Sequence, residues 1–315
     1  RGNELKVSTT LAKPLNFSSC VACGQCLIAC PTGALIENVR FPELSDYIHS
    51  PDTTMVAQVT PAVAVSVAEQ LGYKSGTDFS RMINAALRQC GFDYVFETSA
   101  GADIMIMEQA GILNRRKSGR TGVPLLTSSC PAWVRYVEQF LPELIPHLSP
   151  LKSPHQITSS LVKEMLAEQK NDDRRNIVSV VISSCIAAKN EAQRVETATG
   201  DHPVIELVIT TRELARMIRL SGIDLNRLEP EEPDLPFHCG GSGSMLTAVA
   251  GGEAEATIRT LYRQITRREL TAAKLHRFRV HRSVREMVVS AGEREFRLGA
   301  VSGLANAVEL IEEIT

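Results

Sequence analysis

Short apolar runs alternate with stretches of helical spacing along most of the chain. Residues 55–59 form one such run, and residues 62–71 then follow a helical pattern that stops at Gly72. The same pattern predicts further strands at residues 123–127, 176–182, 204–209 and 296–301. It predicts helices at residues 132–140, 159–169 and 245–268. Two more helices are expected, one from a Thr210-Thr211 cap to about Leu220 and one from Gly303 to about Ile314. Strands that alternate with helices predict an α/β fold with parallel sheets flanked by helices.

Two regions of different character divide the chain. Residues 1–48 are loop-rich and contain four cysteines, whereas residues 49–315 carry the alternating pattern. The mostly β-branched run at residues 176–182 suits a strand that is buried on both faces. A chain of 315 residues is long enough for two lobes with cores of their own.

Composition narrows the classes of function. The chain is 43% hydrophobic and 22% charged with a net charge of −2, so nothing indicates a nucleic-acid or anionic membrane partner. No apolar stretch is long enough to span a bilayer, and no signal peptide is evident. The eight cysteines do not form a disulfide framework, which predicts a reducing cytoplasm. The chain begins at Arg1, and we expect it to be part of a longer polypeptide.

The densest chemical signal is Cys20-x2-Cys23-x2-Cys26-x3-Cys30, followed by Pro31. This is the ligand spacing of a ferredoxin-type [4Fe–4S] site, in which the fourth cysteine ligates a second cluster. We therefore expect Cys20, Cys23 and Cys26 to share one cubane and Cys30 to serve a neighbouring cluster. A zinc site is the alternative, because Cys-x2-Cys pairs also bind zinc. The chain has no other run of this kind to complete the second cluster.

Two further cysteines follow predicted strands. Cys130 comes after residues 123–127 and Cys185 after residues 176–182, each just before a helix. The carboxyl ends of parallel strands are where α/β folds bind ligands, and a helix N-terminus favours a thiolate. Cys90 is expected to pack in a core. The alternative for Cys130 and Cys185 is that both are small buried residues.

Several stretches together resemble the large subunit of [FeFe]-hydrogenases. The stretches are residues 93–98 and 102–108, residues 127–133 with Pro142-Glu143-Leu144 and Lys152-Ser153-Pro154, residues 184–192, residues 251–262, and residues 303–307. The resemblance implies a two-lobed α/β domain with a metal cleft between the lobes, fed by ferredoxin-like clusters. Trp133 is expected to pack against a lobe core.

The family's active cofactor is a cubane joined to a two-iron subsite and held by four cysteines. By resemblance Cys130 and Cys185 match two of them, and the other two would follow Thr315. We expect the two-iron subsite to be absent. A remodelled cluster on Cys130, Cys185 and Cys239, which lies beside His238, is one alternative, and an empty cleft is the other.

The sequence differs from the family at positions that, by the resemblance, form its proton-transfer path. Ser129 stands at the proton-donating cysteine, and Gln109 and Ile112 stand at two glutamates, while Ser149 is retained. A serine hydroxyl, an amide and an alkyl group do not relay protons readily at neutral pH. Ala188 stands at a lysine that pairs with the two-iron subsite, and Ser183-Ser184 replaces Met-Pro.

Three functions are compatible with this pattern. The first is a hydrogenase-derived electron-transfer subunit without hydrogen activity, in a soluble complex with flavoprotein and iron–sulfur subunits, linked to ferredoxin and NAD(P) and capable of electron bifurcation. The chain lacks a strand-linked Gly-x-Gly-x-x-Gly run and is expected to bind no dinucleotide itself. The second is a working or sensory hydrogenase, and the third an iron–sulfur assembly or scaffold protein.

Overall fold

A parallel sheet forms the centre of the first lobe. The structure is a computed structural model that describes residue 9 and residues 12–116, 124–170, 176–194, 202–236, 240–271 and 283–314. The strands β1 (Thr54–Val59), β2 (Tyr94–Glu97), β3 (Ile177–Ser183) and β4 (Leu207–Thr210) are parallel and lie in the order β2-β1-β3-β4. All residues of β1, β3 and β4 are buried. The expected α/β class with a parallel sheet is confirmed.

Helices cover both faces of this sheet, which is why its strands are mostly apolar. The helices α3 (Val63–Gln70), α4 (Ser80–Gln89) and α9 (Thr211–Leu220) pack on one face, and α7 (Pro154–Lys170) and α8 (Ala188–Glu191) on the other. The predicted cap of α9 is confirmed, because Thr210 and Glu213 form a capping box. This lobe therefore has a conventional two-sided core.

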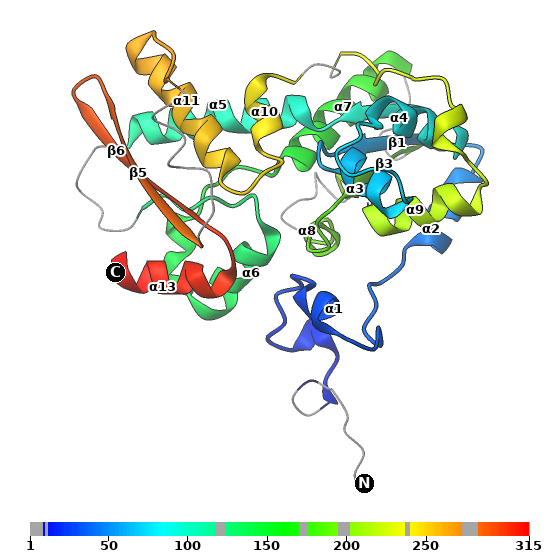
Figure 1. Ribbon diagram of the computed structural model, residues 1–315, viewed down its shortest axis with the longest axis horizontal. Helices are drawn as coiled ribbons and strands as arrows, with labels where there is room; N and C mark the ends of the chain where they lie inside the picture. The colour runs from blue at the N-terminus through cyan, green and yellow to red at the C-terminus, as the bar shows by residue number, and fades with distance from the viewer. Residues whose placement is uncertain are drawn as a thin grey trace, which may run out of the picture.

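The second lobe is built from a hairpin and helices, and α5 (Ser99–Arg115) runs from one lobe to the other (Figure 1). It contains α6 (Pro131–Phe140), η3 (Pro142–His147), α10 (Ser242–Leu246), α11 (Gly252–Thr266), β5 (Val284–Ala291), β6 (Arg294–Val301) and α13 (Leu304–Ile314). The strand predicted at residues 296–301 exists as β6, but it pairs antiparallel with β5, which the sequence pattern did not single out. The second sheet is therefore not parallel.

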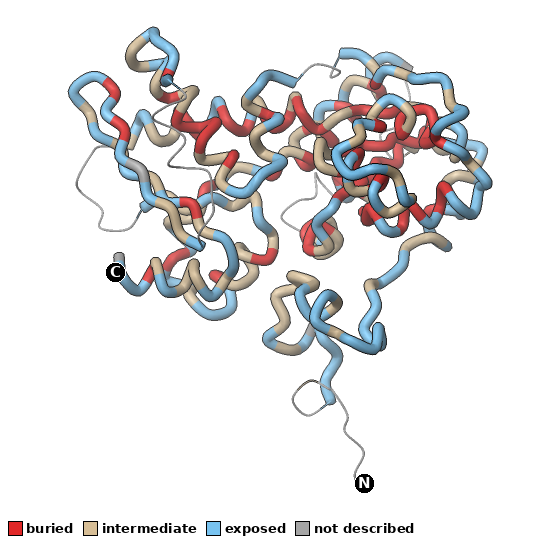
Figure 2. The backbone as a smooth tube through the Cα atoms, viewed as in Figure 1, coloured by how far each residue is buried: buried red, intermediate tan, exposed pale blue. Residues whose placement is uncertain are grey.

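The N-terminal segment hangs below the two lobes in Figure 1. It contains η2 (Leu15–Phe17) and α1 (Gln25–Ala29) and joins the first lobe through α2 (Phe41–Ile48). None of the residues from 12 to 43 whose burial is described is buried, and Leu44 is the first to enter a core (Figure 2). The segment therefore has no hydrophobic core of its own.

Three sequence predictions need correction. Within residues 124–127 there is no strand, only an isolated bridge between Leu126 and Leu148, because Pro124 cannot donate to a sheet. The helix predicted at residues 245–268 is divided into α10 and α11 where Gly251 adopts a left-handed conformation. The strand predicted from residue 204 begins only at Leu207.

A short 3-10 helix, η6 (Leu225–Arg227), belongs to the first lobe, where Leu225 is part of the main core.

No helix in the described part of the chain is long and apolar enough to cross a bilayer.

Candidate iron–sulfur site and adjoining cleft

The first three cysteines of the motif lie on a tight loop that leads into α1. Ala22 and Gly24 in this loop both have left-handed backbone conformations, with φ of 57° and 76°. Such turns gather backbone N–H groups around one point, an arrangement common at iron–sulfur sites. The amide of Ala22 already donates to the Cys20 sulfur at 3.4 Å. The loop therefore fits an anionic cluster bound by Cys20, Cys23 and Cys26.

Cys30 ends α1 and differs from these three. Its sulfur lies 3.5 Å from the Thr32 hydroxyl. The hydrogen bond from Thr32, supported by backbone N–H groups of the following turn, lowers the pKa of the thiol to about 7. Since the thiolate is the form that binds iron, Cys30 is suited to ligation close to neutral pH. No contact in the structure shows which cluster it would serve.

The cysteine geometry does not resemble the site of a single metal ion. Among the residues that the structure describes, no three Cys, His, Asp or Glu side chains are placed to surround one ion. The thiolates of a cubane bind different irons and therefore lie further apart than the ligands of one zinc ion.

The cluster loop touches the turn that carries Cys185. A Cβ built on Gly24 would lie 2.4 Å from the Cγ2 atom of Ile186, so only glycine permits this approach. Ile186 follows Cys185 directly in the sequence. The cluster loop therefore contacts the residue that follows Cys185.

The two cleft cysteines come from different lobes. Cys130 is the N-cap of α6, and Cys185 follows β3 and precedes α8. Both residues keep exposed surface. Each cysteine thus stands shortly before a helix, as the sequence predicted, although Cys130 does not follow a strand.

The expectation of an activated thiolate is wrong for Cys185. Burial of the sulfur raises its pKa, and this outweighs hydrogen bonds from the amides of Ala187 and Ala188. A buried dyad lies behind this turn: His155 Nε2 is 2.7 Å from Glu191 Oε2 and 3.1 Å from Ser153 Oγ. Burial raises the pKa of Glu191, but the charge and hydrogen bond of His155 outweigh it and leave the pKa lowered.

Ser129 has a partner that sequence reasoning missed. Its hydroxyl donates to Glu253 Oε2, in the first turn of α11. Burial raises the pKa of Glu253, and the hydrogen bond from Ser129 only partly opposes this. The two residues are 124 positions apart. No local sequence signal could have joined them.

The other positions assigned to proton transfer form a separate pair. Ser149 Oγ donates to Gln109 Oε1 at 2.6 Å, and both residues are buried. In the described part of the chain, no side-chain hydrogen bond links this pair to Ser129 and Glu253. An amide cannot exchange its protons as a carboxyl can. The Ser149–Gln109 and Ser129–Glu253 pairs are two separate local hydrogen bonds.

Lys189, which follows Ala188, contacts α9 and the N-terminal segment. Its ammonium lies 2.6 Å from Glu213 Oε2 on α9 and 2.6 Å from the carbonyl oxygen of Asn38 in the N-terminal segment. Ala188 itself is buried against the sheet. Neither residue presents a charge to the cleft.

The other predicted residues have simpler positions. His238 and Cys239 lie outside the described residues, and so does the remodelled site that would use Cys239. Cys90 follows α4 as its C-cap rather than lying within it; it packs against the main core, and burial raises the pKa of its thiol. Trp133 packs beside Val137 and Leu144, which confirms its predicted role.

Comparison with known proteins defines the class of this fold and site. Residues 53–315 match the model of the iron-only hydrogenase large subunit, C-terminal domain, and residues 13–36 match that of a 4Fe-4S binding domain. The chain therefore belongs to the iron-only hydrogenase large-subunit family. The resemblance seen in the sequence is confirmed.

Individual relatives agree with this class. The chain is 35% identical, over 99% of its length, to "NADP-reducing hydrogenase subunit HndD" of Solidesulfovibrio fructosivorans, and spans 54% of that protein. An apo [FeFe]-hydrogenase from Chlamydomonas reinhardtii superimposes with a TM-score of 0.76 at 29% identity, covering 88% of this chain and 78% of the other. A more distant relative, 26% identical over 95% of this chain and 66% of the other, is "Cytosolic iron-sulfur assembly component 3" of Bos taurus.

Proposed function

We propose that this chain is an iron–sulfur electron-transfer subunit, derived from a hydrogenase but without hydrogen activity. Residues 1–48 are the ferredoxin-like part and carry at least one [4Fe–4S] cluster on Cys20, Cys23 and Cys26. A second cluster is shared through Cys30. Residues 49–315 form the hydrogenase-like domain, whose two-iron subsite is absent. The domain serves as the partner surface of the cluster-bearing part.

One observation carries this proposal. The cluster loop has the full cysteine motif and a left-handed glycine that touches Ile186, next to Cys185. The positions that the family uses for proton transfer hold Ser129, Gln109 and Ile112 instead. Electron transfer needs only a cluster and a short path, whereas hydrogen chemistry also needs protons delivered to the metal. The residues present support the first requirement better than the second.

The partners follow from the same proposal. The relative named as a subunit of an NADP-reducing hydrogenase supports a place in a hetero-oligomeric complex. We assign to that complex a flavoprotein and further iron–sulfur subunits, ferredoxin and NAD(P) as redox partners, electron bifurcation as the reaction type, and the cytoplasm as the location.

Anaerobic reconstitution tests the electron-transfer role. The chain, loaded with iron and sulfide, should show the electron paramagnetic resonance signal of a reduced [4Fe–4S] cluster after dithionite treatment. Oxidised viologen of sufficiently high potential should then remove the electron. A chain that binds no iron, or a cluster that exchanges no electron with the mediator, would contradict the proposal.

A working or sensory hydrogenase is a second candidate, favoured by the carboxyl of Glu253 beside Ser129. A cofactor in the cleft would use Cys130 and Cys185. Under the leading proposal, changing both to alanine leaves the iron content unchanged. Loss of iron from the double variant would instead show a cluster in the cleft and favour this second candidate.

An iron–sulfur assembly role is the third candidate. It is supported by the relative named as a cytosolic iron–sulfur assembly component. Gentle anaerobic affinity purification distinguishes it from electron transfer: co-purified flavin subunits favour the leading proposal, and co-purified assembly proteins favour this one.

A further inference from the structure

The N-terminal segment must be held in place by something other than a hydrophobic core. No residue from 12 to 43 whose burial is described is buried, and Phe17, Ile28 and Ile36 are largely exposed. The Gly24–Ile186 contact joins only two residues. One apolar contact is too small to fix the orientation of a whole segment. Polar contacts must therefore contribute to holding it.

A group of partly buried charges supplies these contacts; we call Lys189, Glu37 and Glu213 the latch. Lys189 Nζ is 2.6 Å from Glu213 Oε2 and 3.5 Å from Glu37 Oε2. The Glu37 side chain also accepts from Thr210 Oγ1 at 3.0 Å and from Arg212 Nε at 3.1 Å. One lysine is thus shared between a carboxylate of the segment and a carboxylate of the first lobe.

The backbone of the segment is tied to the same charges. The carbonyl of Asn38 accepts from Lys189 Nζ, and the amide of Arg40 donates to Glu213 Oε1 at 2.9 Å. These bonds hold Asn38 and Arg40 in the linker before α2. Both are charge-assisted, and the bond from the Arg40 amide to Glu213 is partly shielded from water.

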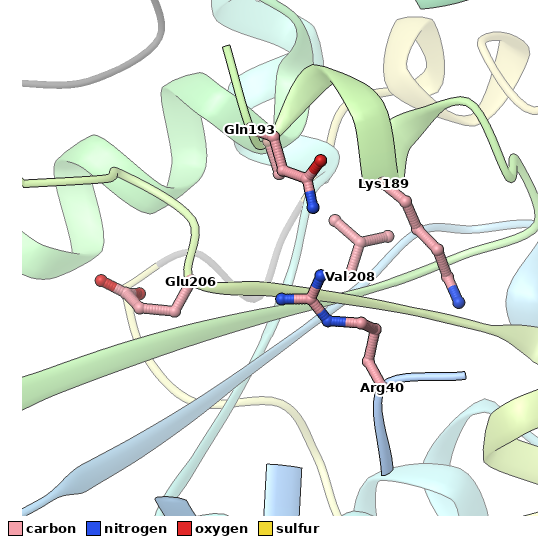
Figure 3. A pocket seen from close by; sticks show the side chains of 6 residues that line it. Arg40, Lys189, Gln193, Glu206 and Val208 are labelled. Carbon is pink, nitrogen blue, oxygen red and sulfur yellow. The ribbon is translucent and has the colours of Figure 1, made fainter. Parts of the chain in front are cut away.

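The latch lies beside a small recess between the linker and the sheet edge (Figure 3). Lys189 and Gln193 reach into it from α8 and the turn after it, Arg40 from the linker, and Glu206 and Val208 from the edge of the sheet. The buried Nε of Arg40 has no hydrogen-bond partner among the described residues. Lys189 reaches from α8 to the segment, where it contacts the Asn38 carbonyl and Glu37.

We propose that Lys189 is a positioning residue that holds the iron–sulfur segment against the Cys185 turn. Lys189 and Ile186 belong to the same short stretch after β3, so the stretch that carries Cys185 contacts both the cluster loop and the linker. The latch fixes the orientation of the cluster relative to the domain. This inference rests on the proposed electron-transfer function, because a cluster must sit at a constant distance from its acceptor to exchange electrons at a constant rate.

Hydrogen exchange of the reconstituted chain tests the latch. Lys189→Met should accelerate exchange of amides in residues 12–40, including Arg40, by about tenfold or more, since the partly buried Glu37 and the buried Glu213 lose their shared partner. Lys189→Arg keeps the charge and should restore most of the protection. Glu37→Gln should act like Lys189→Met while leaving the folded lobe unchanged.

Lys163→Met is the matched control. The Lys163 and Lys189 side chains are 9% and 13% exposed, and Lys163 pairs with Glu206 and the Pro203 carbonyl without touching the segment. The control should accelerate exchange only around α7 and β4. Wild-type exchange at residues 12–40 in both Lys189→Met and Glu37→Gln would overturn the proposal. A wild-type chain without a cluster would contradict the proposed function instead, and the latch can still be measured in that sample.

Discussion

The iron–sulfur segment and the cleft are constructed in opposite ways. The segment keeps every cysteine of its cluster motif but buries no residue between positions 12 and 43 whose burial is described. The hydrogenase-like domain is built on a close-packed sheet and helices, and by the resemblance to its family Ser129 and Gln109 stand at proton-carrying positions. The comparison suggests that ligand chemistry constrains the first region, while packing maintains the second.

This contrast also explains how each region is stabilised. The segment depends on its cluster, the latch and one glycine contact, so its order should follow the state of the cluster. The lobes depend on burial of strands such as β1 and β3, which needs no cofactor. Changes in one region should therefore leave the other largely intact.

The largest effect should come from a cluster ligand. Cys23→Ala should abolish the cubane signal of the reconstituted chain and unfold residues 12–36, because no core remains there. The thermal midpoint of the lobes should be nearly unchanged. Iron analysis, spectroscopy and calorimetry measure the three quantities. Cys90→Ala, which removes a core thiol, should leave iron unaffected; equal iron loss in both variants would break the comparison.

The next effect should come from the dyad behind Cys185. His155→Leu leaves Glu191 charged and buried, which should cost about 3–5 kcal/mol of unfolding free energy at neutral pH. Urea unfolding measures it. The double variant His155→Leu/Glu191→Gln should recover most of the loss, because the buried carboxylate charge is then removed as well.

The pH dependence of this dyad has a defined sign. The folded pKa of Glu191 is lowered, so its contribution is present above the ordinary carboxyl pKa and is lost as pH falls through the lowered value. Wild type should therefore lose more stability on acidification than His155→Leu does. Equal acid sensitivity would contradict this role of the dyad.

The contact between the two regions should have an intermediate effect. Gly24→Ala imposes a left-handed conformation on alanine, costing about 1–2 kcal/mol, and also a clash with Ile186. Gly33→Ala is matched, because Gly33 has φ of 65° but no atom within 4 Å of its added Cβ. Iron loss to a chelator should be faster in Gly24→Ala than in Gly33→Ala. Equal rates would show that the contact does not support the segment.

The smallest effect should come from Glu253. Its folded pKa is raised, so the folded state holds its proton more tightly, and stability declines as pH rises from the ordinary carboxyl pKa through the raised value. Glu253→Gln removes this decline and should gain stability relative to wild type over that range. Chemical unfolding across the range measures the difference, and parallel profiles would count against a buried acid at this position.

The sequence predicted the parts of the fold that local pattern determines. The strands β1 and β3 are mostly apolar runs, and α9 has a cap of its own in Thr210 and Glu213. The strand β5 was missed because Arg285 and Glu286 interrupt its apolar pattern, and its pairing with β6 is non-local. The apolar pattern of residues 123–127 also gave no weight to Pro124, which has no backbone N–H to donate to a neighbouring strand.

The candidate site likewise has one part that local sequence predicts and one part that it does not. The cluster motif is readable because its four cysteines are close in sequence. The partners of Ser129, His155 and Lys189 are distant in sequence and appear only when the chain is folded. Such pairs carry no short-range signal.

Hydrogen turnover tests the central claim most directly. The full-length protein, matured anaerobically together with the machinery that inserts the family's cofactor, is supplied with reduced viologen, and evolved hydrogen is measured beside an active family member. The account predicts no hydrogen above background while the cubane on Cys20, Cys23 and Cys26 is reduced. Turnover at the rate of the active enzyme would contradict it.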